Sequence, residues 1–147
     1  MITGVNHVTL SVRDLDVSFD FYTKILGIKP RAKWLQGAYL EAGKIWIALI
    51  VDKKMRTHNN PEYSHLALSV KPKDFGPISK RIRESGAKIW HRNTTEGPSI
   101  YFLDPDGHKL EIHVGDLKTR LIWAKTNPWK GLEFFNNNYQ SQWFFLP

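Results

Sequence analysis

Two histidines and one glutamate are the residues of this 147-residue chain best suited to hold a metal ion. His7 and His65 each open a stretch in which polar and apolar residues alternate, and Glu111 lies in a third such stretch. Side chains alternate between the two faces of a β-strand, so all three lie on polar faces of predicted strands. Two imidazoles and one carboxylate leave coordination positions open, which is typical of catalytic divalent-metal sites. The sequence therefore predicts a site made of His7, His65 and Glu111.

The other histidines compete with this interpretation. A single histidine on a strand is more often a hydrogen-bonded structural residue than a ligand. His113 shares the polar face of Glu111 and is a rival ligand or a hydrogen-bonding partner behind the ligands. His58 and His108 fall in predicted loops, where we expect them to be solvated. The chain has no cysteine, so a metal here must use nitrogen and oxygen ligands.

An internal repeat strengthens the case for the paired histidines. The stretch HVTLSVR (7–13) returns as HLALSVK (65–71), always 58 positions later, and Asp16 and Asp74 keep the same offset. With one inserted residue, Gly27 corresponds to Gly86. Two copies are too few for a solenoid, so we expect two packed modules.

Each module begins with a strand and continues with a helix. The first helix is predicted to be capped by Asp14 or Asp16 and to end at Gly27, with these residues facing inward: Val17, Phe21, Ile25 and Leu26. The second is predicted to be capped by Asp74 and to end at Gly86. We expect Phe75, Ile78 and Ile82 to face inward and Pro77 to lie in the first turn, where a missing N–H is tolerated.

Three strand-like runs follow each helix. They are predicted around Lys29–Trp34, Ala38–Glu41 and Ile45–Ile50 in the first module, and around Lys88–His91, Ser99–Leu103 and Lys109–Val114 in the second. A tight turn is expected at Asp104–Gly107. Counting from the turn glycines pairs Ile47 with Glu111, so the first module has no carboxylate at that place. The pattern β-α-β-β-β, twice, predicts an α+β fold with helices on one face of curved sheets.

Composition narrows the class of protein. An apolar share of 41% and a charged share of 24% predict a folded globular chain. We find no apolar run of membrane-spanning length and no secretory signal, which predicts a cytoplasmic protein with no membrane partner. The net charge of +7 is spread along the chain without a nucleic-acid-binding motif, so most of it is interpreted as solvated surface and no nucleic-acid partner is expected.

Longer motifs resemble a known family. They read GVNHVTLSV (4–12), FYTKILGI (21–28), QGAYLEAGKIWIAL (36–49), YSHLALSV (63–70), NTTEGPSIYFLDPDGHKLEIHVGDLKTRL (93–121) and NPWKGLEFF (127–135). Together they resemble the vicinal oxygen chelate superfamily, with its glyoxalase-like fold, and within it the glutathione transferase branch of the fosfomycin-resistance proteins. The resemblance implies a single domain: module one about 1–52, a linker 53–62, module two about 63–121, and a C-terminal extension 122–147. The tail Asn136–Pro147 lies outside the motifs.

The resemblance implies a metal centre shared between two chains. The metal would be Mn²⁺, or another divalent ion, held by His7 of one chain and by His65 and Glu111 of its partner in a module-swapped homodimer. The metal would bind the phosphonate and epoxide oxygens of fosfomycin while a thiolate attacks the ring carbon. Thr9 resembles the threonine that hydrogen bonds to the epoxide oxygen, although a β-branched residue in a strand needs no such role.

The loop before the predicted strand 99–103 resembles a K⁺ site near the phosphonate, with Asn93, Gly97 and Ser99 as its cation-binding residues. The positions that resemble phosphonate-contacting residues are Thr9, His91, Thr95, Ser99, Tyr101 and Arg120. Arg120 suits this role because a guanidinium pairs with phosphonate oxygens in a planar fork.

The thiol side of the site matches less well. Trp34, Gln36 and Tyr39 resemble thiol-binding residues, and Tyr39 would help to form the thiolate. The departures are four: His91 stands where that branch usually has lysine, Thr95 where it has serine, and Ile50 and Thr94 where it has serine and arginine. The implied function is metal-dependent addition of glutathione to the epoxide of fosfomycin or a related phosphonate, which confers resistance.

Other functions remain open on the same scaffold. Another thiol, or water in an epoxide hydrolysis, could replace glutathione. An extradiol dioxygenase would use the same ligands with Fe²⁺, but it would not need a loop like 93–99 or Arg120. A glyoxalase I activity is disfavoured by Ile47, because it generally uses a carboxylate from each module. A non-enzymatic drug-binding module would have the fold without the metal ligands.

Overall fold

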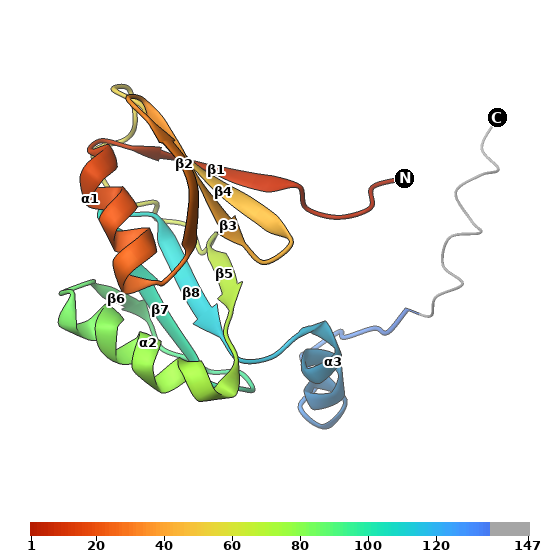
Figure 1. Ribbon diagram of the computed structural model, residues 1–147. Coiled ribbons are helices and arrows are strands. Elements are labelled where there is room, and N and C mark those ends of the chain that lie inside the picture. Colours follow the sequence, from red (N-terminus) through yellow and green to blue (C-terminus); the bar gives the residue numbers. More distant parts are fainter. Residues whose placement is uncertain (136–147) are drawn as a thin grey trace, which may run out of the picture. The chain divides into compact units, whose positions relative to one another are not determined.

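The computed structural model describes residues 1–135, which divide into two compact units, one of Met1–Gly115 and one that begins at Asp116. The first unit contains both copies of the repeat (Figure 1). The second unit begins within the range 63–121 that the sequence assigned to the second module. The tail Asn136–Pro147 lies outside the described residues.

The first copy forms a four-stranded sheet in the order β1-β4-β3-β2. Its strands β1 and β4 are parallel, and the other neighbours are antiparallel. A short helix and a π-helical turn connect β1 to β2. The elements are β1 (His7–Val12), α1 (Leu15–Asp20), η1 (Phe21–Ile25), β2 (Lys29–Trp34), β3 (Gly37–Ala42) and β4 (Ile45–Val51).

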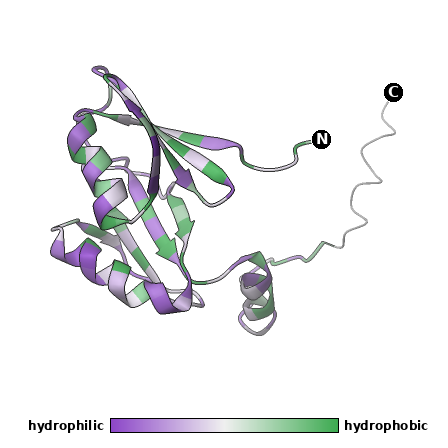
Figure 2. Ribbon diagram, viewed as in Figure 1, coloured by the Kyte–Doolittle hydropathy of each residue, from purple (hydrophilic) through white to green (hydrophobic). Residues whose placement is uncertain are grey.

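The second copy repeats this topology, with the order β5-β8-β7-β6 and a parallel pair β5–β8. Its elements are β5 (Leu66–Ser69), α2 (Pro72–Glu84), β6 (Ile89–His91), β7 (Ser99–Leu103) and β8 (Lys109–His113). The predicted α+β fold of paired βαβββ modules is therefore confirmed. Purple and green both run along the strands and helices of the first unit, as expected for elements with one apolar face (Figure 2).

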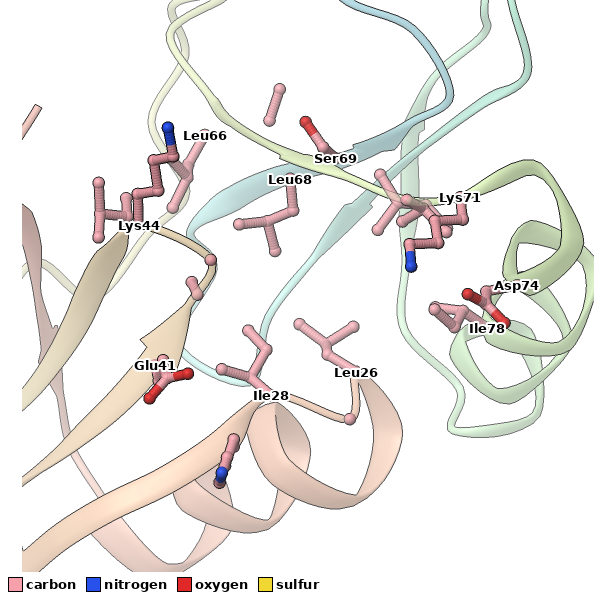
Figure 3. A pocket seen from close by; sticks show the side chains of 18 residues that line it. Leu26, Ile28, Glu41, Lys44, Leu66, Leu68, Ser69, Lys71, Asp74 and Ile78 are labelled. Atoms are coloured by element: carbon pink, nitrogen blue, oxygen red, sulfur yellow. The ribbon is translucent and has the colours of Figure 1, made fainter. Parts of the chain in front are cut away.

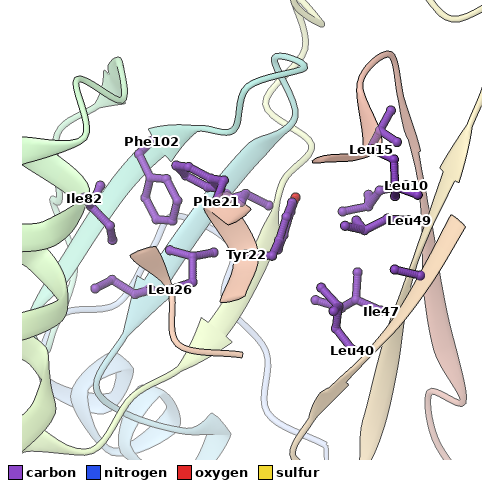
Figure 4. Close-up of a cluster of buried hydrophobic side chains, with 14 of the residues drawn as sticks. Leu10, Leu15, Phe21, Tyr22, Leu26, Leu40, Ile47, Leu49, Ile82 and Phe102 are labelled. Carbon is purple, nitrogen blue, oxygen red and sulfur yellow. The ribbon is translucent and has the colours of Figure 1, made fainter. Parts of the chain in front are cut away.

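The core lies between the two copies. Phe21, Tyr22 and Leu26 sit between Ile82 and Phe102 on one side and side chains of the first sheet on the other (Figure 4). The first-sheet side chains are Leu10, Leu15, Leu40, Ile47 and Leu49. The helical segment 15–25 therefore packs on its own sheet and also contacts the second module.

The turn Asp104–Gly107 joins the modules with buried polar contacts. Asp104 Oδ2 accepts a hydrogen bond from the Tyr22 hydroxyl (2.8 Å), and Asp106 Oδ2 accepts one from the Ser18 hydroxyl (2.7 Å). Asp106 Oδ1 also accepts from the backbone N–H of Arg13 (3.0 Å). Both carboxyl groups are buried, and burial raises the pKa of Asp104 above its ordinary value. The predicted turn therefore also locks the second module to the first.

Two helix predictions were wrong in detail. Asp14 caps the first helix, as one of the two alternatives proposed, but Val17 faces solvent, and Leu15 and Ser18 are buried instead. The second helix starts earlier than predicted, with Pro72 in its first turn and Lys71 before it. Pro77 consequently lies inside the helix rather than in its first turn. Pro72 has a fixed φ suited to a helix start, and this advantage outweighs the capping preference of Asp74.

The second unit contains α3 (Leu117–Thr126). Asp116 caps it: its side chain accepts a hydrogen bond from the Thr119 N–H (2.8 Å), and its own N–H donates to the Thr119 hydroxyl (2.9 Å). The Thr119 N–H lowers the pKa of Asp116. Among residues 1–135, no helix is long and apolar enough to cross a membrane.

Candidate functional site

Glu111 and His65 form the centre of the polar face of the second sheet. Glu111 projects from β8, and only 5% of its surface is exposed. Its Oε2 lies 3.0 Å from Nε2 of His65, which immediately precedes β5. The parallel pairing of β5 and β8 brings the two residues together from positions that are far apart in the sequence.

A chain of hydrogen bonds fixes the other oxygen of Glu111. The Ser99 hydroxyl donates to Glu111 Oε1 (2.6 Å), and Ser99 Oγ also lies 2.7 Å from His113 Nδ1. A serine hydroxyl has one hydrogen to give, so His113 Nδ1–H is the donor in the second contact. His113 therefore orients Ser99 from behind, with Nδ1 3.7 Å from the carboxylate oxygen.

The orientation of His65 suits metal binding. Its Nδ1–H donates to the backbone carbonyl of Tyr63 (2.9 Å), because a carbonyl can only accept. In neutral His65, Nε2 then carries a lone pair directed at the same space as Glu111 Oε2. Two ligand atoms bound at right angles, each about 2.1 Å from a metal, would be roughly 3 Å apart. The nitrogen–oxygen pair therefore fits a divalent cation.

Aromatic rings surround this pair. Tyr101 lies on β7 directly opposite Glu111, and its ring contacts those of His65 (5.6 Å) and His91 (5.0 Å). Burial and the nearby Glu111 raise the pKa of Tyr101 to about 12, so its hydroxyl keeps its proton as a donor. His91 is half-buried, and its ring also contacts Tyr63 (5.2 Å) and Trp90 (5.4 Å).

The loop 93–99 is folded around Asn93. The Asn93 amide donates to the Gly97 carbonyl (2.8 Å), and Asn93 Oδ1 accepts from the N–H of Thr95 (3.2 Å). Gly97 has a φ of +73°, and a Cβ there would collide with the carbonyl oxygen of Val114. Glycine is required at this position for both reasons. Thr94 is exposed.

The first sheet carries a row of exposed aromatic side chains on its polar face. The His7 ring stacks on Trp46 of β4 (4.5 Å between ring centroids), and its Nδ1 lies 2.8 Å from Asn6 Oδ1. Tyr39 contacts both Trp46 (6.5 Å) and Trp34 (4.9 Å). Thr9 shares this face, is exposed, and pairs in register with Ala48. Gln36 is exposed, Ile50 is half-buried, and Ile50 pairs with Gly37.

His7 is not part of the His65–Glu111 pair within one chain. Among the described residues, no three His, Cys, Asp or Glu side chains are gathered closely enough to hold a metal ion. Arg120 lies on α3, in the second unit.

The register corrects one sequence-based pairing. Glu111 pairs with Ala67, and Thr9, the repeat partner of Ala67, pairs with Ala48. The counterpart of Glu111 is therefore Ala48, whereas Ile47 is a buried core residue. Counting from the turn glycines was wrong by one residue, which moves a side chain to the opposite face of a strand. The conclusion that the first module lacks this carboxylate is unchanged.

A cavity of about 630 Å³ lies at the junction of the modules. Its walls are mainly apolar, and charged residues stand at its edge (Figure 3). The labelled wall residues are Leu26, Ile28, Leu66, Leu68 and Ile78, with Glu41, Lys44, Lys71 and Asp74 among the polar ones. It contains none of the predicted site residues.

The part of the chain that matches a known family is nearly the same as the first structural unit. Residues 4–112 match the sequence profile of the Glyoxalase/Bleomycin resistance protein/Dioxygenase superfamily. The chain belongs to this superfamily. Among the superfamily's curated members, it is 43% identical to the glutathione transferase FosA of Serratia marcescens, over 91% of this chain and 96% of that protein. It is 39% identical to the metallothiol transferase FosB of Staphylococcus epidermidis, over 84% and 90% of the two chains.

Solved structures of superfamily members agree with this assignment. The fosfomycin resistance protein FosX of Mesorhizobium loti superposes with a TM-score of 0.69 at 30% identity, covering 82% of this chain and 99% of that one. A variant of FosX from Listeria monocytogenes, in complex with Mn(II) and 1S,2S-dihydroxypropylphosphonic acid, gives a TM-score of 0.71 at 28% identity, covering 82% and 97%. The resemblance to fosfomycin-resistance proteins is confirmed.

Sequence reasoning missed four residues at the two histidines: Trp46, Tyr63, Trp90 and Lys109. Lys109 carried a usable signal, because it shares the polar face of β8 with Glu111, whereas β4, the strand of Trp46, contains no predicted site residue. Tyr63 lies in an irregular segment before β5, and Trp90 lies on a three-residue edge strand. Neither segment has a periodicity long enough to assign a face.

Proposed function

We propose that this protein catalyses metal-dependent addition of glutathione to the epoxide of fosfomycin or a closely related phosphonate. The observation that carries this proposal is the His65–Glu111 pair, held by Ser99 and Tyr63, in a chain 43% identical to a named glutathione transferase. Trp34 and Tyr39 provide an exposed aromatic surface for the thiol substrate, with Gln36 nearby in the sequence.

The metal centre in this proposal consists of His7, His65 and Glu111, with Mn²⁺ as the preferred ion. Nitrogen and carboxylate ligands with open positions suit a catalytic divalent ion. When bound, the ion acts as a Lewis acid toward the phosphonate and epoxide oxygens. A K⁺ ion held near Asn93, Gly97 and Ser99 would add positive charge beside the phosphonate.

The chain's own groups would orient the substrate and move its charge. Tyr101, with its protonated hydroxyl, and Ser99 face the pair directly; Thr95, His91 and Arg120 are the other proposed phosphonate contacts. Tyr39 would assist loss of the thiol proton. The sulfur–carbon bond forms as the carbon–oxygen bond of the ring breaks, and Thr9 would donate a hydrogen bond to the oxygen that gains charge. That oxygen then takes up a proton to become a hydroxyl group.

The functional unit in this proposal is a homodimer in which each centre is shared. His7 is not grouped with His65 and Glu111 inside the described part of one chain. Strands β1 and β5, next to these histidines, are both sheet edges and so have backbone groups available for pairing with a second copy. The linker 53–62 would connect modules one and two across this arrangement.

The test is to incubate the protein with Mn²⁺, K⁺, fosfomycin and a panel of thiols, and to follow the phosphonate by phosphorus NMR. We expect a thiol adduct with glutathione, and loss of the reaction in Glu111→Ala together with at least tenfold weaker Mn²⁺ binding. A diol product would show that water is the nucleophile, and a different preferred thiol would reassign the second substrate. Tight Mn²⁺ binding in Glu111→Ala would overturn the proposed ligand set.

A further inference from the structure

His65 immediately precedes β5 and is not itself a member of the second sheet. The β5 ladder begins at Leu66, and residues 61–65 form an irregular segment. The direction of the His65 ring therefore depends on the hydrogen bond from its Nδ1 to the Tyr63 carbonyl (2.9 Å). Whatever fixes the backbone at residues 62–63 also fixes Nε2 relative to Glu111.

Lys109 makes the contact that holds this backbone. It lies on the same face of β8 as Glu111, two residues earlier, and its Nζ donates to the carbonyl oxygen of Glu62 (2.5 Å). The same ammonium group lies 4.7 Å from the centre of the Trp90 ring. The charge thus contacts a carbonyl oxygen and an aromatic face, both of which attract a cation.

Trp90 and Tyr63 extend this contact to the histidine. Trp90 Nε1–H donates to the carbonyl of Leu110 in β8 (3.4 Å). The Trp90 ring contacts those of Tyr63 (5.6 Å) and His65 (5.6 Å), and Tyr63 also contacts His65 (5.1 Å). The segment 62–65 is therefore tied to β8 by one charged hydrogen bond and a set of ring contacts.

In the first module, the corresponding histidine, His7, is held by a different kind of contact. Trp46 pairs in register with His7 and stacks on its ring (4.5 Å). Trp46 lies two residues before Ala48, as Lys109 lies two residues before Glu111, so the two residues occupy equivalent places. A residue at this place thus contacts the histidine directly in one module and holds its backbone segment in the other.

We propose that Lys109 is a positioning residue for His65: by holding the carbonyl of Glu62, it sets the Tyr63 carbonyl and thereby directs His65 Nε2 toward the metal. This inference rests on the proposed metal centre. Loss of the ammonium group would release residues 62–63 and let the imidazole rotate. Arginine would preserve the function, because its guanidinium can also donate to a carbonyl while it lies over an aromatic ring.

The test uses the metal-free full-length protein and four forms: wild type, Lys109→Met, Lys109→Arg, and Lys88→Met as a control. Lys88→Met removes the same charge from an exposed residue next to β6. Mn²⁺ affinity is measured by electron paramagnetic resonance. The hydrogen-bonded Nδ1 proton of His65 is followed by NMR without metal and assigned by its loss in His65→Gln. Thermal unfolding of each form reports on the fold.

We expect Lys109→Met to bind Mn²⁺ about tenfold more weakly and to show rapid exchange of the His65 Nδ1 proton. Lys109→Arg should stay close to wild type, and Lys109→Met should unfold at the same temperature as Lys88→Met. The inference is overturned if Lys109→Met matches Lys88→Met in both affinity and proton exchange, or if Lys109→Arg loses as much affinity as Lys109→Met. Absence of Mn²⁺ binding by the wild type would instead overturn the proposed function, and the Nδ1 proton would still decide the role of Lys109.

Discussion

His91 is the predicted phosphonate contact at which the family resemblance implies a lysine instead, and its surroundings define what it can do. The ring is half-buried among those of Tyr63, Trp90 and Tyr101 rather than directed into solvent. His91 pairs with Tyr101 on the neighbouring strand, and Tyr101 in turn pairs with Glu111. A charge placed here would therefore act on substrates at the proposed metal centre with little screening by water.

The substitution His91→Lys tests this position. A lysine is fully charged at pH 7.5, and its cation would attract the phosphonate and favour the thiolate form of an incoming thiol. We expect kcat/KM with glutathione to rise about tenfold, equivalent to about 1.4 kcal/mol in the transition state.

The exposed linker residue His58 provides the control, because His58→Lys adds the same charge away from the site. Steady-state kinetics from pH 6.5 to 8.5 would distinguish the two variants. Equal rates for both would contradict a role for His91 and direct attention to Thr94 and Ile50.

At the same scale, the sequence predicted that His65 and Glu111 belong to one site, and they do lie together, but it did not predict the residues that hold them in place. Strand alternation alone places His65 and Glu111 each on the polar side of a predicted strand, because period-2 patterning is a local property. Contacts such as Lys109 to the Glu62 carbonyl join residues 47 positions apart and involve backbone atoms, which no residue pattern encodes. His108 shows the same limit: it was expected to be solvated, but its Nε2 lies 2.7 Å from the Ser11 carbonyl.

At the scale of elements, the turn Asp104–Gly107 has a second function that its turn chemistry does not reveal. Asp104 accepts hydrogen bonds from the Tyr22 hydroxyl and from the N–H groups of Asp106 and His108 (2.8, 2.9 and 2.8 Å). Burial raises its pKa, although the nearby His108 and these donors oppose the shift. Burial and the Asp104 carboxyl likewise raise the pKa of Tyr22 well above its ordinary value.

This arrangement predicts how stability depends on pH. Because the pKa of Asp104 is raised, the native protein keeps a proton that the unfolded chain releases, and a rise in pH through this window favours unfolding. Asp104→Asn removes the titration and keeps an acceptor for both N–H groups. We expect the difference in free energy of unfolding, wild type minus variant, to fall as the pH rises from 4 upward.

Urea denaturation at half-unit intervals between pH 4 and 7 measures this difference. Asp20→Asn is the matched control, since Asp20 is an exposed residue whose carboxylate is paired with Lys24 at the surface (2.7 Å). If the difference between wild type and Asp104→Asn grows as the pH rises, the pKa of Asp104 is lowered by folding, and the prediction is wrong.

Element types were predicted well because each has a strong local signal, and their ends less well because competing signals overlap there. The strands β3 and β4, for example, each follow turn residues, at Leu35–Gln36 and at Gly43–Lys44. The start of α2 depended on a choice between Pro72 and Asp74, each of which is favoured near a helix N-terminus. The inward face of α1 was misjudged at Val17, because the segment changes to a π-helical turn at Phe21 and the 3.6-residue period no longer holds.

For the whole molecule, the repeat predicts two modules, but a repeat in one chain does not determine which copies meet. The modules of one chain contact each other through the core around Phe21 and the turn at Asp104, on the apolar side of both sheets. Their histidine-bearing polar faces do not assemble one centre in the described part of the chain. In the homodimer that we propose, a second copy brings His7 to His65 and Glu111.

Mixing experiments test this shared centre. His7→Ala and Glu111→Ala should each be inactive alone. In a mixed dimer of the two variants, one centre carries both lesions and the other carries neither. After unfolding and refolding an equal mixture, half of the dimers are mixed, so activity should recover to roughly a quarter of wild type in a two-fold symmetric assembly.

The control mixture pairs His65→Ala with Glu111→Ala, whose lesions lie in the same module: every centre keeps one lesion, and no activity should return. Native mass spectrometry confirms that mixed dimers have formed in both samples. If mixed dimers form and the first pair stays as inactive as the second, His7 belongs to a centre other than the one at Glu111, and the shared-centre proposal is wrong.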